Sequence, residues 1–252
     1  MTGFTGSSFA RPLRPSLFTV ALALSLSASL QSFAQKDKKD GGGMWSGQVA
    51  PDFRSLDTSP AEETEAGKWI VKDINTLVSY AKIREPNNQL KIFKFKILRM
   101  NTATPGDAYA RRGSDGQLEI YYSAAFEGKL TRPEYLVKYI TLAHEIGHHL
   151  LKHTETNAPA ITQQDELKAD QMAGCLFSGV VYNLKVPLGP EDHKREKVLF
   201  SDVEKYFLTH EKDRDDGVHA SINVRLDWVW SGWAFATQEG HCHNIRPPKP
   251  KP

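Results

Sequence analysis

The apolar residues of the chain recur mainly with helical spacing. In the first such segment they occupy the positions that share one face of a helix: Trp69, Ile70, Ile74, Leu77, Val78 and Ala81. The preceding Ser59-Pro60-Ala61-Glu62 has the pattern of a capping box with proline at the first helical position. We therefore expect a helix that begins after Ser59 and ends before Pro86-Asn87-Asn88.

Two short stretches instead alternate between apolar and polar residues, which is typical of half-buried strands. In residues 92–98, IFKFKIL, the apolar side chains Phe93, Phe95 and Ile97 fall on one side and the lysines on the other. A second strand is predicted at residues 118–122, LEIYY, after the turn Gly113-Ser114-Asp115-Gly116.

Helical spacing returns after these strands. Thr131-Arg132-Pro133-Glu134 is a second capping box, and it opens a helix whose predicted core positions are Leu136, Ile140, Ala143, Leu150 and Leu151. Residues 154–163 are polar and predict a loop. Further helices are predicted at 164–182, 191–209 and 219–237, the last rich in tryptophan. The pattern predicts an α+β fold, mostly helical with a small β-sheet.

The N-terminus has the pattern of an export signal. Arg11 and Arg14 precede the apolar run LFTVALALSLSASL at 17–30, and Ser32-Phe33-Ala34 fits a cleavage site. The alternative is a membrane anchor, but the run is shorter than the about 20 residues that a spanning helix needs. We expect a signal peptide at 1–34, a flexible linker at 35–58, one domain at 59–245 and a disordered Pro/Lys tail at 246–252. The mature protein would be periplasmic or secreted, without a membrane span.

Composition bears on two questions, whether the protein binds nucleic acid and whether it contains a disulfide. The chain has a net charge of +2, and removal of Arg11 and Arg14 with the signal would bring it to zero, which does not favour nucleic acid as a partner. The two cysteines, Cys175 and Cys242, could form a disulfide after export, or both could be unpaired, with Cys175 a small buried residue.

The chemistry is concentrated in HEIGHH at 144–149. His144 and His148 are four residues apart, so both imidazoles leave one face of the helix and can meet at one zinc ion. Glu145 lies one step round the helix, as the general base does in the H-E-x-x-H arrangement. Gly147 would let another backbone approach closely. His149 points about 100° away from His148, and we interpret it as packing or polar support.

A catalytic zinc needs a third protein ligand. Our choice is Glu166 in ELKAD at 166–170, with Asp165 and Asp170 as rivals; His153, nine residues after His144, is not expected to be a ligand. Glu166 and Asp170 share a helix face, so one carboxylate can bind metal while the other accepts a hydrogen bond from a ligand imidazole. The alternative is a solvated acidic edge.

In these residues the chain resembles the HtpX and CAAX-prenyl-endopeptidase family of gluzincin zinc metallopeptidases. Four segments follow the family's order: Asp107-Ala108-Tyr109-Ala110 with the strand 118–122, the zinc helix HEIGHHLLKH at 144–153, ELKAD at 166–170, and HASINVR at 219–225. Asp107 replaces the usual asparagine and Ala220 the usual proline, and the membrane helices of many relatives are absent.

The resemblance implies a zincin-like domain in which the H-E-x-x-H helix is followed by a ligand helix. One zinc ion would be held by His144, His148 and Glu166, with Glu145 as base and proton donor and Asp170 orienting a ligand histidine. His219 would stabilise the oxyanion, and Arg225 would hold the carboxylates. The substrate residues would be Asp107, Ala108, Tyr109 and Ile120, and we expect an extended polypeptide to add to strand 118–122.

The sequence therefore predicts an exported zinc endopeptidase acting on peptide bonds, with unfolded exported proteins as candidate substrates. One alternative is a catalytically silent, zinc-stabilised chaperone or assembly factor of the cell envelope, although that would have no need of Glu145. Another is a binding domain without metal built around Trp228, Trp230 and Trp233.

Overall fold

A computed structural model describes residues 56–81, 92–101, 108–155, 158, 160–182, 190–210, 219–242 and 245. The predicted signal peptide, nearly all of the predicted linker, Asp107 and the tail 246–252 lie outside the described residues. Within the described part, no helix has the length and apolar character that crossing a membrane requires.

The structure contains a four-stranded sheet. Its strands are β1 (Thr58–Pro60), β2 (Phe95–Met100), β3 (Ala108–Arg112) and β4 (Leu118–Ser123), in the spatial order β1-β2-β4-β3. β2 and β4 are parallel, whereas the β1–β2 and β3–β4 pairs are antiparallel. β4 is therefore an internal strand, and β3 forms one edge of the sheet.

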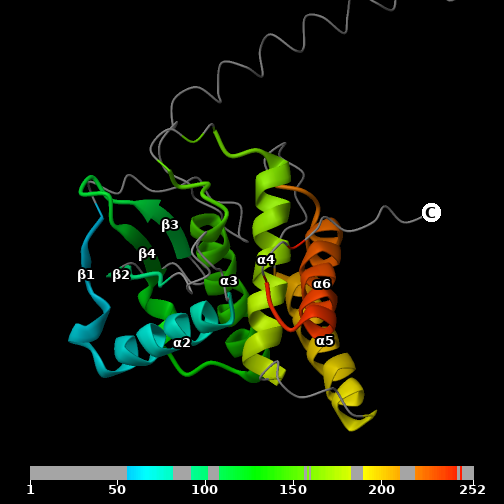
Figure 1. Ribbon diagram of the computed structural model, residues 1–252. Coiled ribbons are helices and arrows are strands. Elements are labelled where there is room, and N and C mark those ends of the chain that lie inside the picture. The colour runs from blue at the N-terminus through cyan, green and yellow to red at the C-terminus, as the bar shows by residue number, and fades with distance from the viewer. Residues whose placement is uncertain are drawn as a thin grey trace, which may run out of the picture. The chain divides into compact units, whose positions relative to one another are not determined.

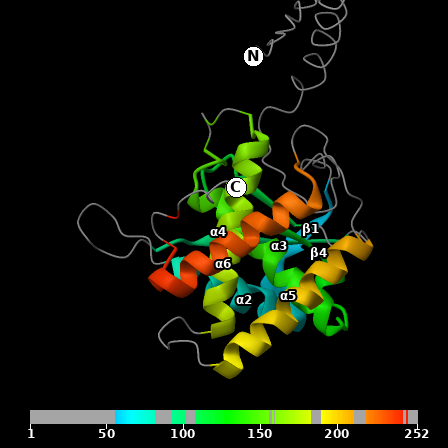
Figure 2. The ribbon, with the colours of Figure 1, turned by 90° about the vertical axis from the view of Figure 1, so that its right-hand side faces the viewer.

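Helices make up the rest of the described fold. They are α2 (Glu65–Ala81), α3 (Arg132–Leu150), α4 (Gln163–Tyr182), α5 (Pro190–His210) and α6 (Ile222–Glu239), with the short 3-10 helices η1 (Ala61–Glu63) and η2 (Ala124–Glu127). α3 lies between the sheet and α4 (Figure 1), and α6 crosses the far side of α4 (Figure 2). The prediction of a mostly helical α+β fold with a small sheet is confirmed.

The start of the first helix differs from the prediction. Thr58–Pro60 pairs with β2, so the backbone around Ser59 is part of the sheet and cannot cap a helix. The chain makes the single turn η1, and α2 begins at Glu65, where Thr64 Oγ1 accepts a hydrogen bond from the Gly67 N–H at 2.8 Å. The capping box at Thr131 is present as predicted and starts α3.

Apolar side chains are buried on both faces of the sheet. Phe95 and Ile97 face the main core between sheet and helices, as the alternation predicts. The opposite face is covered as well, because a second cluster packs there: Leu98, Met100, Tyr109 and Tyr121, with Leu56 against it. Burial on both faces explains why β2 runs on to Met100, beyond the alternating stretch.

Two features hold α4 and α6 together. A Cβ on Gly174 would lie 1.8 Å from the Val229 carbonyl oxygen, and a Cβ on Gly232 would lie 1.8 Å from the Gln171 carbonyl oxygen. Each backbone thus occupies the space that a side chain on the other helix would need. Cys175 of α4 forms a disulfide with Cys242, just after α6, which resolves the alternative left open by the sequence.

Candidate metal centre

Three side chains from α3 and α4 converge in the interior. His144 and His148 are completely buried, and their Nε2 atoms lie 3.0 Å apart. Glu166, in the first turns of α4, places Oε2 3.2 Å from His144 Nε2 and Oε1 3.6 Å from His148 Nε2. One donor atom from each residue lies within 4.8 Å of the other two, so the three could together hold a metal ion.

Close packing of the two helices brings these groups together. A Cβ on Gly147 would lie 3.1 Å from the Ala169 carbonyl oxygen and 3.2 Å from Met172 Cβ. The absence of a side chain at position 147 therefore lets α4 approach the histidine-bearing part of α3, as the sequence suggested. Glu166 and Asp170, one helical turn apart, both face α3 as a result.

The two rival carboxylates have other partners. Asp170 accepts a hydrogen bond from His144 Nδ1 at 2.8 Å, and it also accepts two from Arg225. Asp165 lies at the start of α4, where its Oδ2 accepts hydrogen bonds from the N–H and the hydroxyl of Thr162. Glu166 is thus the carboxylate that faces both imidazoles.

The electrostatics of the cluster favour a cation. Burial acts to raise the pKa of Asp170, but Arg225 and His144 outweigh it and lower that pKa. The pKa of Glu166 is likewise well below its usual range, since His148 and His144 overcome the effect of burial. Burial acts to lower the pKa of His144, but Asp170 and Glu166 raise it to about 10. Two buried carboxylates thus face one guanidinium, and the second positive charge that balances them is a protonated His144 or, in its place, a metal ion.

This donor set fits a metal ion. It combines two imidazole nitrogens with a carboxylate oxygen, all buried, and Glu166 Oε1 has no hydrogen-bond partner within the described part of the chain. A buried acceptor left in that condition costs free energy, whereas coordination to a cation would satisfy it.

Glu145 lies beside the donor set and is completely buried. Among the described residues, neither of its carboxylate oxygens has a partner at hydrogen-bonding geometry. Burial raises the pKa of Glu145 well above its usual range, and His144, the backbone N–H of Ala110 and Arg225 oppose this only in part. Because Ala110 belongs to β3, the Glu145 side chain lies close to this edge strand of the sheet.

The remaining predicted site residues divide into two groups. Arg225 and His219 come from the N-terminal end of α6 and the residues before it, and His219 Nε2 lies 4.0 Å from Glu166 Oε2. Tyr109 instead packs into the second cluster on the opposite face of the sheet, and Ala108 is part of the main core.

The prediction that a peptide adds to strand 118–122 is wrong. Both sides of β4 are already paired, with β2 and with β3, and Ile120 is completely buried in the main core. The edge strands of the sheet are β1 and β3, and the sequence analysis had not identified β3 as a strand because its five residues show no alternation.

Two further histidines surround the cluster. His149 is buried, with Nε2 2.9 Å from the Glu119 carbonyl oxygen and Nδ1 2.8 Å from Thr154 Oγ1, in agreement with polar support. His153 lies with Nδ1 3.0 Å from Nδ1 of His148, a contact that the sequence analysis missed. Its signal would have been a histidine just beyond the end of the motif helix.

Comparisons of the chain with protein-family models, with curated proteins and with solved structures find no match. The case for a function therefore rests on the chemistry of the residues described above.

Proposed function

We propose that the protein is a zinc-dependent endopeptidase in which His144, His148 and Glu166 hold one zinc ion and Glu145 is the general base. Two imidazoles and one carboxylate form a ligand set that catalytic zinc sites use, with one position left for water or substrate. The observation that carries the proposal is the buried, incompletely hydrogen-bonded carboxylate of Glu145 next to that set.

A bound zinc ion supplies Lewis-acid chemistry, which makes water acidic and polarises a carbonyl group. Glu145 takes a proton from the attacking water and then delivers it to the leaving amine. The burial that raises the pKa of Glu145 helps this carboxyl group to hold the proton between the two steps, and the positive charge of a bound zinc ion would favour the carboxylate that accepts the proton first.

The neighbouring residues orient these groups. Asp170 accepts the hydrogen of His144 Nδ1, so the lone pair of Nε2, which lies on the Glu166 side, would be available to hold a zinc ion. Arg225 holds Asp170 in turn. His219 lies on the Glu166 side of the cluster, with Nε2 4.0 Å from Glu166 Oε2, and in this proposal it would donate a hydrogen bond to the developing oxyanion.

The substrate in this proposal is an extended polypeptide. β3 is an edge strand, and its Ala110 N–H is close to Glu145. Ala108, Tyr109 and Ala110 are buried in the structure, so a peptide would pair with β3 beside the base only after this edge is uncovered. Such pairing reads the backbone more than side chains, which suits unfolded segments of exported proteins. The Cys175–Cys242 disulfide agrees with export to an oxidising compartment.

The test compares the wild-type protein with Glu145→Gln, using unfolded casein as substrate and metal analysis of both proteins. We expect equal zinc content and loss of cleavage in the variant, because glutamine keeps the volume but cannot take up a proton. The control variant is Glu155→Gln, which makes the same substitution at an exposed position, and it should cleave casein as the wild type does. Equal cleavage by wild type and Glu145→Gln would refute the assignment of the base.

The silent chaperone or assembly factor would require the ligands but not Glu145. Burying a carboxyl group without full hydrogen bonding costs free energy, of the order of 1–3 kcal/mol. A purely structural zinc site would gain nothing in return for that cost, which is why we favour the enzyme.

A further inference from the structure

The chain reverses direction at the end of α3, immediately after the second histidine of the motif. Lys152 has a positive φ of 66°, its N–H donates to the His149 carbonyl at 3.2 Å, and the N–H of His153 donates to the His148 carbonyl at 2.9 Å. These paired bonds make a Schellman turn, with a lysine where glycine is usual. The turn carries His153 back over the last turn of α3.

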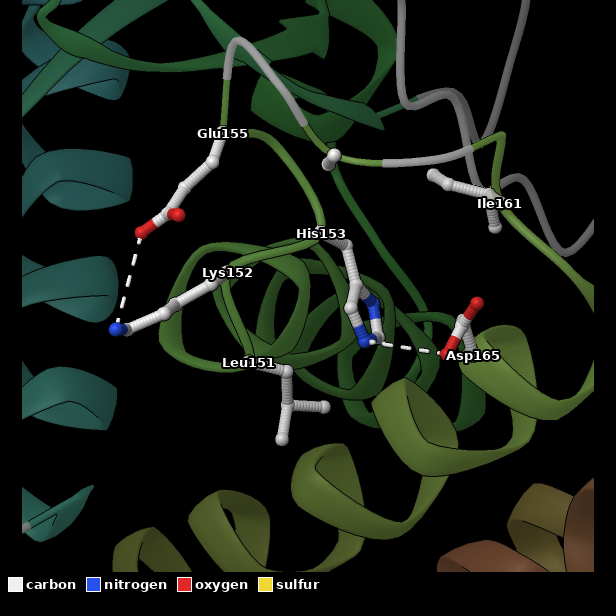
Figure 3. A pocket seen from close by; sticks show the side chains of 7 residues that line it. Leu151, Lys152, His153, Glu155, Ile161 and Asp165 are labelled. Carbon is white, nitrogen blue, oxygen red and sulfur yellow. Dashed lines mark ion pairs between the residues drawn. The ribbon is translucent and has the colours of Figure 1, made fainter.

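The reversal places one imidazole against another. Nδ1 of His153 lies 3.0 Å from Nδ1 of His148, and the two rings are steeply inclined, at 64°. The other nitrogen of His153, Nε2, lies 3.7 Å from Oδ1 of Asp165. Figure 3 shows His153 pointing from the turn toward Asp165 at the start of α4.

The positions of the protons follow from the geometry. Nε2 of His148 faces the donor set, 3.0 Å from His144 Nε2 and 3.6 Å from Glu166 Oε1. A metal ligand must offer a lone pair there, so neutral His148 carries its proton on Nδ1. Among the described residues, that proton faces His153 Nδ1 at 3.0 Å, which then accepts it, so the proton of neutral His153 lies on Nε2, facing Asp165.

We propose that His153, backed by Asp165, is a positioning residue that holds the ligand His148 as the Nδ1–H tautomer with Nε2 turned to the metal. The inference rests on the metal site of the proposed function, and it adds a partner for the second ligand histidine. Asp170 does the same for His144, so each imidazole ligand has its own acceptor.

The two supports differ in their surroundings. Asp170 is completely buried and held by Arg225, whereas His153 and Asp165 line a cavity of about 330 Å³ with Leu151, Lys152, Glu155, Ala158 and Ile161. The His148 side of the centre therefore borders a hollow, and the support there is a side chain that can be replaced without opening the core.

The test uses the mature protein and zinc affinity, measured by competition with a chelating dye. His153→Leu removes the acceptor and should weaken zinc binding about 10- to 100-fold. His153→Gln can accept from His148 through its amide oxygen and donate to Asp165 through its NH2, so it should recover most of the affinity. Glu155→Gln, which changes another residue of the same cavity, should bind zinc as the wild type does.

A second measurement needs no variant. Long-range nitrogen–proton NMR spectra of the zinc-loaded wild type should show His148 protonated on Nδ1 and His153 on Nε2. The inference is overturned if His153 is protonated on Nδ1, or if the Leu and Gln variants lose equal affinity or neither loses any. Failure of the wild type to bind zinc would overturn the proposed function itself, which separates the two results.

Discussion

Arg225 donates two hydrogen bonds to Asp170, from Nε to Oδ2 at 2.8 Å and from Nη2 to Oδ1 at 2.9 Å. Both side chains are buried, and the same Oδ1 accepts from His144 Nδ1. A guanidinium on α6 therefore holds a carboxylate on α4, which in turn fixes the orientation of the His144 imidazole on α3. The positions of three helices are coupled to the geometry of one imidazole.

Replacing Arg225 should consequently affect both stability and metal binding. Arg225→Met leaves the Asp170 carboxylate buried without its cation, which should lower the free energy of unfolding by about 3–5 kcal/mol. Zinc affinity should fall too, because His144 loses a rigid support. Arg225→Met combined with Asp170→Asn should recover part of the stability. Denaturant unfolding and dye competition measure the two effects, and an unchanged stability of the single variant would contradict the argument.

The parts of the site that the sequence could predict are those set by local spacing. His144 and His148 share a face because they are four apart in one helix, and the capping box at Thr131 determines where that helix begins. The 3.6-residue repeat also places Glu166 and Asp170 on one face, but it does not decide which of the two faces both imidazoles, and only the family resemblance favoured Glu166.

The parts that could not be predicted depend on distant partners. β1 has only three residues and exists because β2 lies beside it, so no periodicity marks it. The internal position of β4 follows from the order of all the strands. His153 returns to His148 because Lys152 adopts a left-handed conformation, and a lysine gives no local sign of such a turn.

The close contacts of Gly174 and Gly232 between α4 and α6 lead to a second prediction, on the stability of variants at these two positions. Gly174→Ala or Gly232→Ala would place a Cβ inside the space of a backbone carbonyl, so the helices must separate. We expect a loss of about 1–3 kcal/mol or more in the free energy of unfolding. Val224→Ala, at an exposed position of α6, is the matched control and should change little.

Zinc affinity provides a further readout for the glycine variants. Because Arg225 on α6 must reach Asp170 on α4, a wider helix separation should also weaken zinc binding. Full stability together with full affinity in both glycine variants would mean that the two helices tolerate separation.

Acid should destabilise the protein partly through His149. Burial lowers the pKa of this residue to about 4, against 6.5 in the unfolded chain. Between these values the unfolded chain binds a proton that the folded chain does not, so stability rises with pH across the window and is lost as pH falls through it. The shift corresponds to about 3 kcal/mol.

His149→Gln isolates that contribution. Glutamine can still donate to the Glu119 carbonyl and accept from Thr154, but it does not titrate. From pH 7 to pH 4 the wild type should lose about 3 kcal/mol more unfolding free energy than the variant. Groups other than His149 titrate equally in both proteins, so parallel stability curves would show that His149 is not responsible.

The disulfide between Cys175 and Cys242 closes a loop with a sequence separation of 67 residues that contains α5, α6 and Arg225. Its main effect is on the unfolded chain, whose freedom it restricts, and a loop of this length corresponds to about 4 kcal/mol. Replacing both cysteines with alanine should lower the free energy of unfolding by that amount.

A reductant should destabilise the wild type but leave the cysteine-free variant unchanged, which separates loss of the bond from loss of sulfur packing. If reduced and oxidised wild type unfold at the same denaturant concentration, the bond does not stabilise the fold, and the register of α4 against α6 must depend on the glycine contacts and the Arg225–Asp170 pair alone.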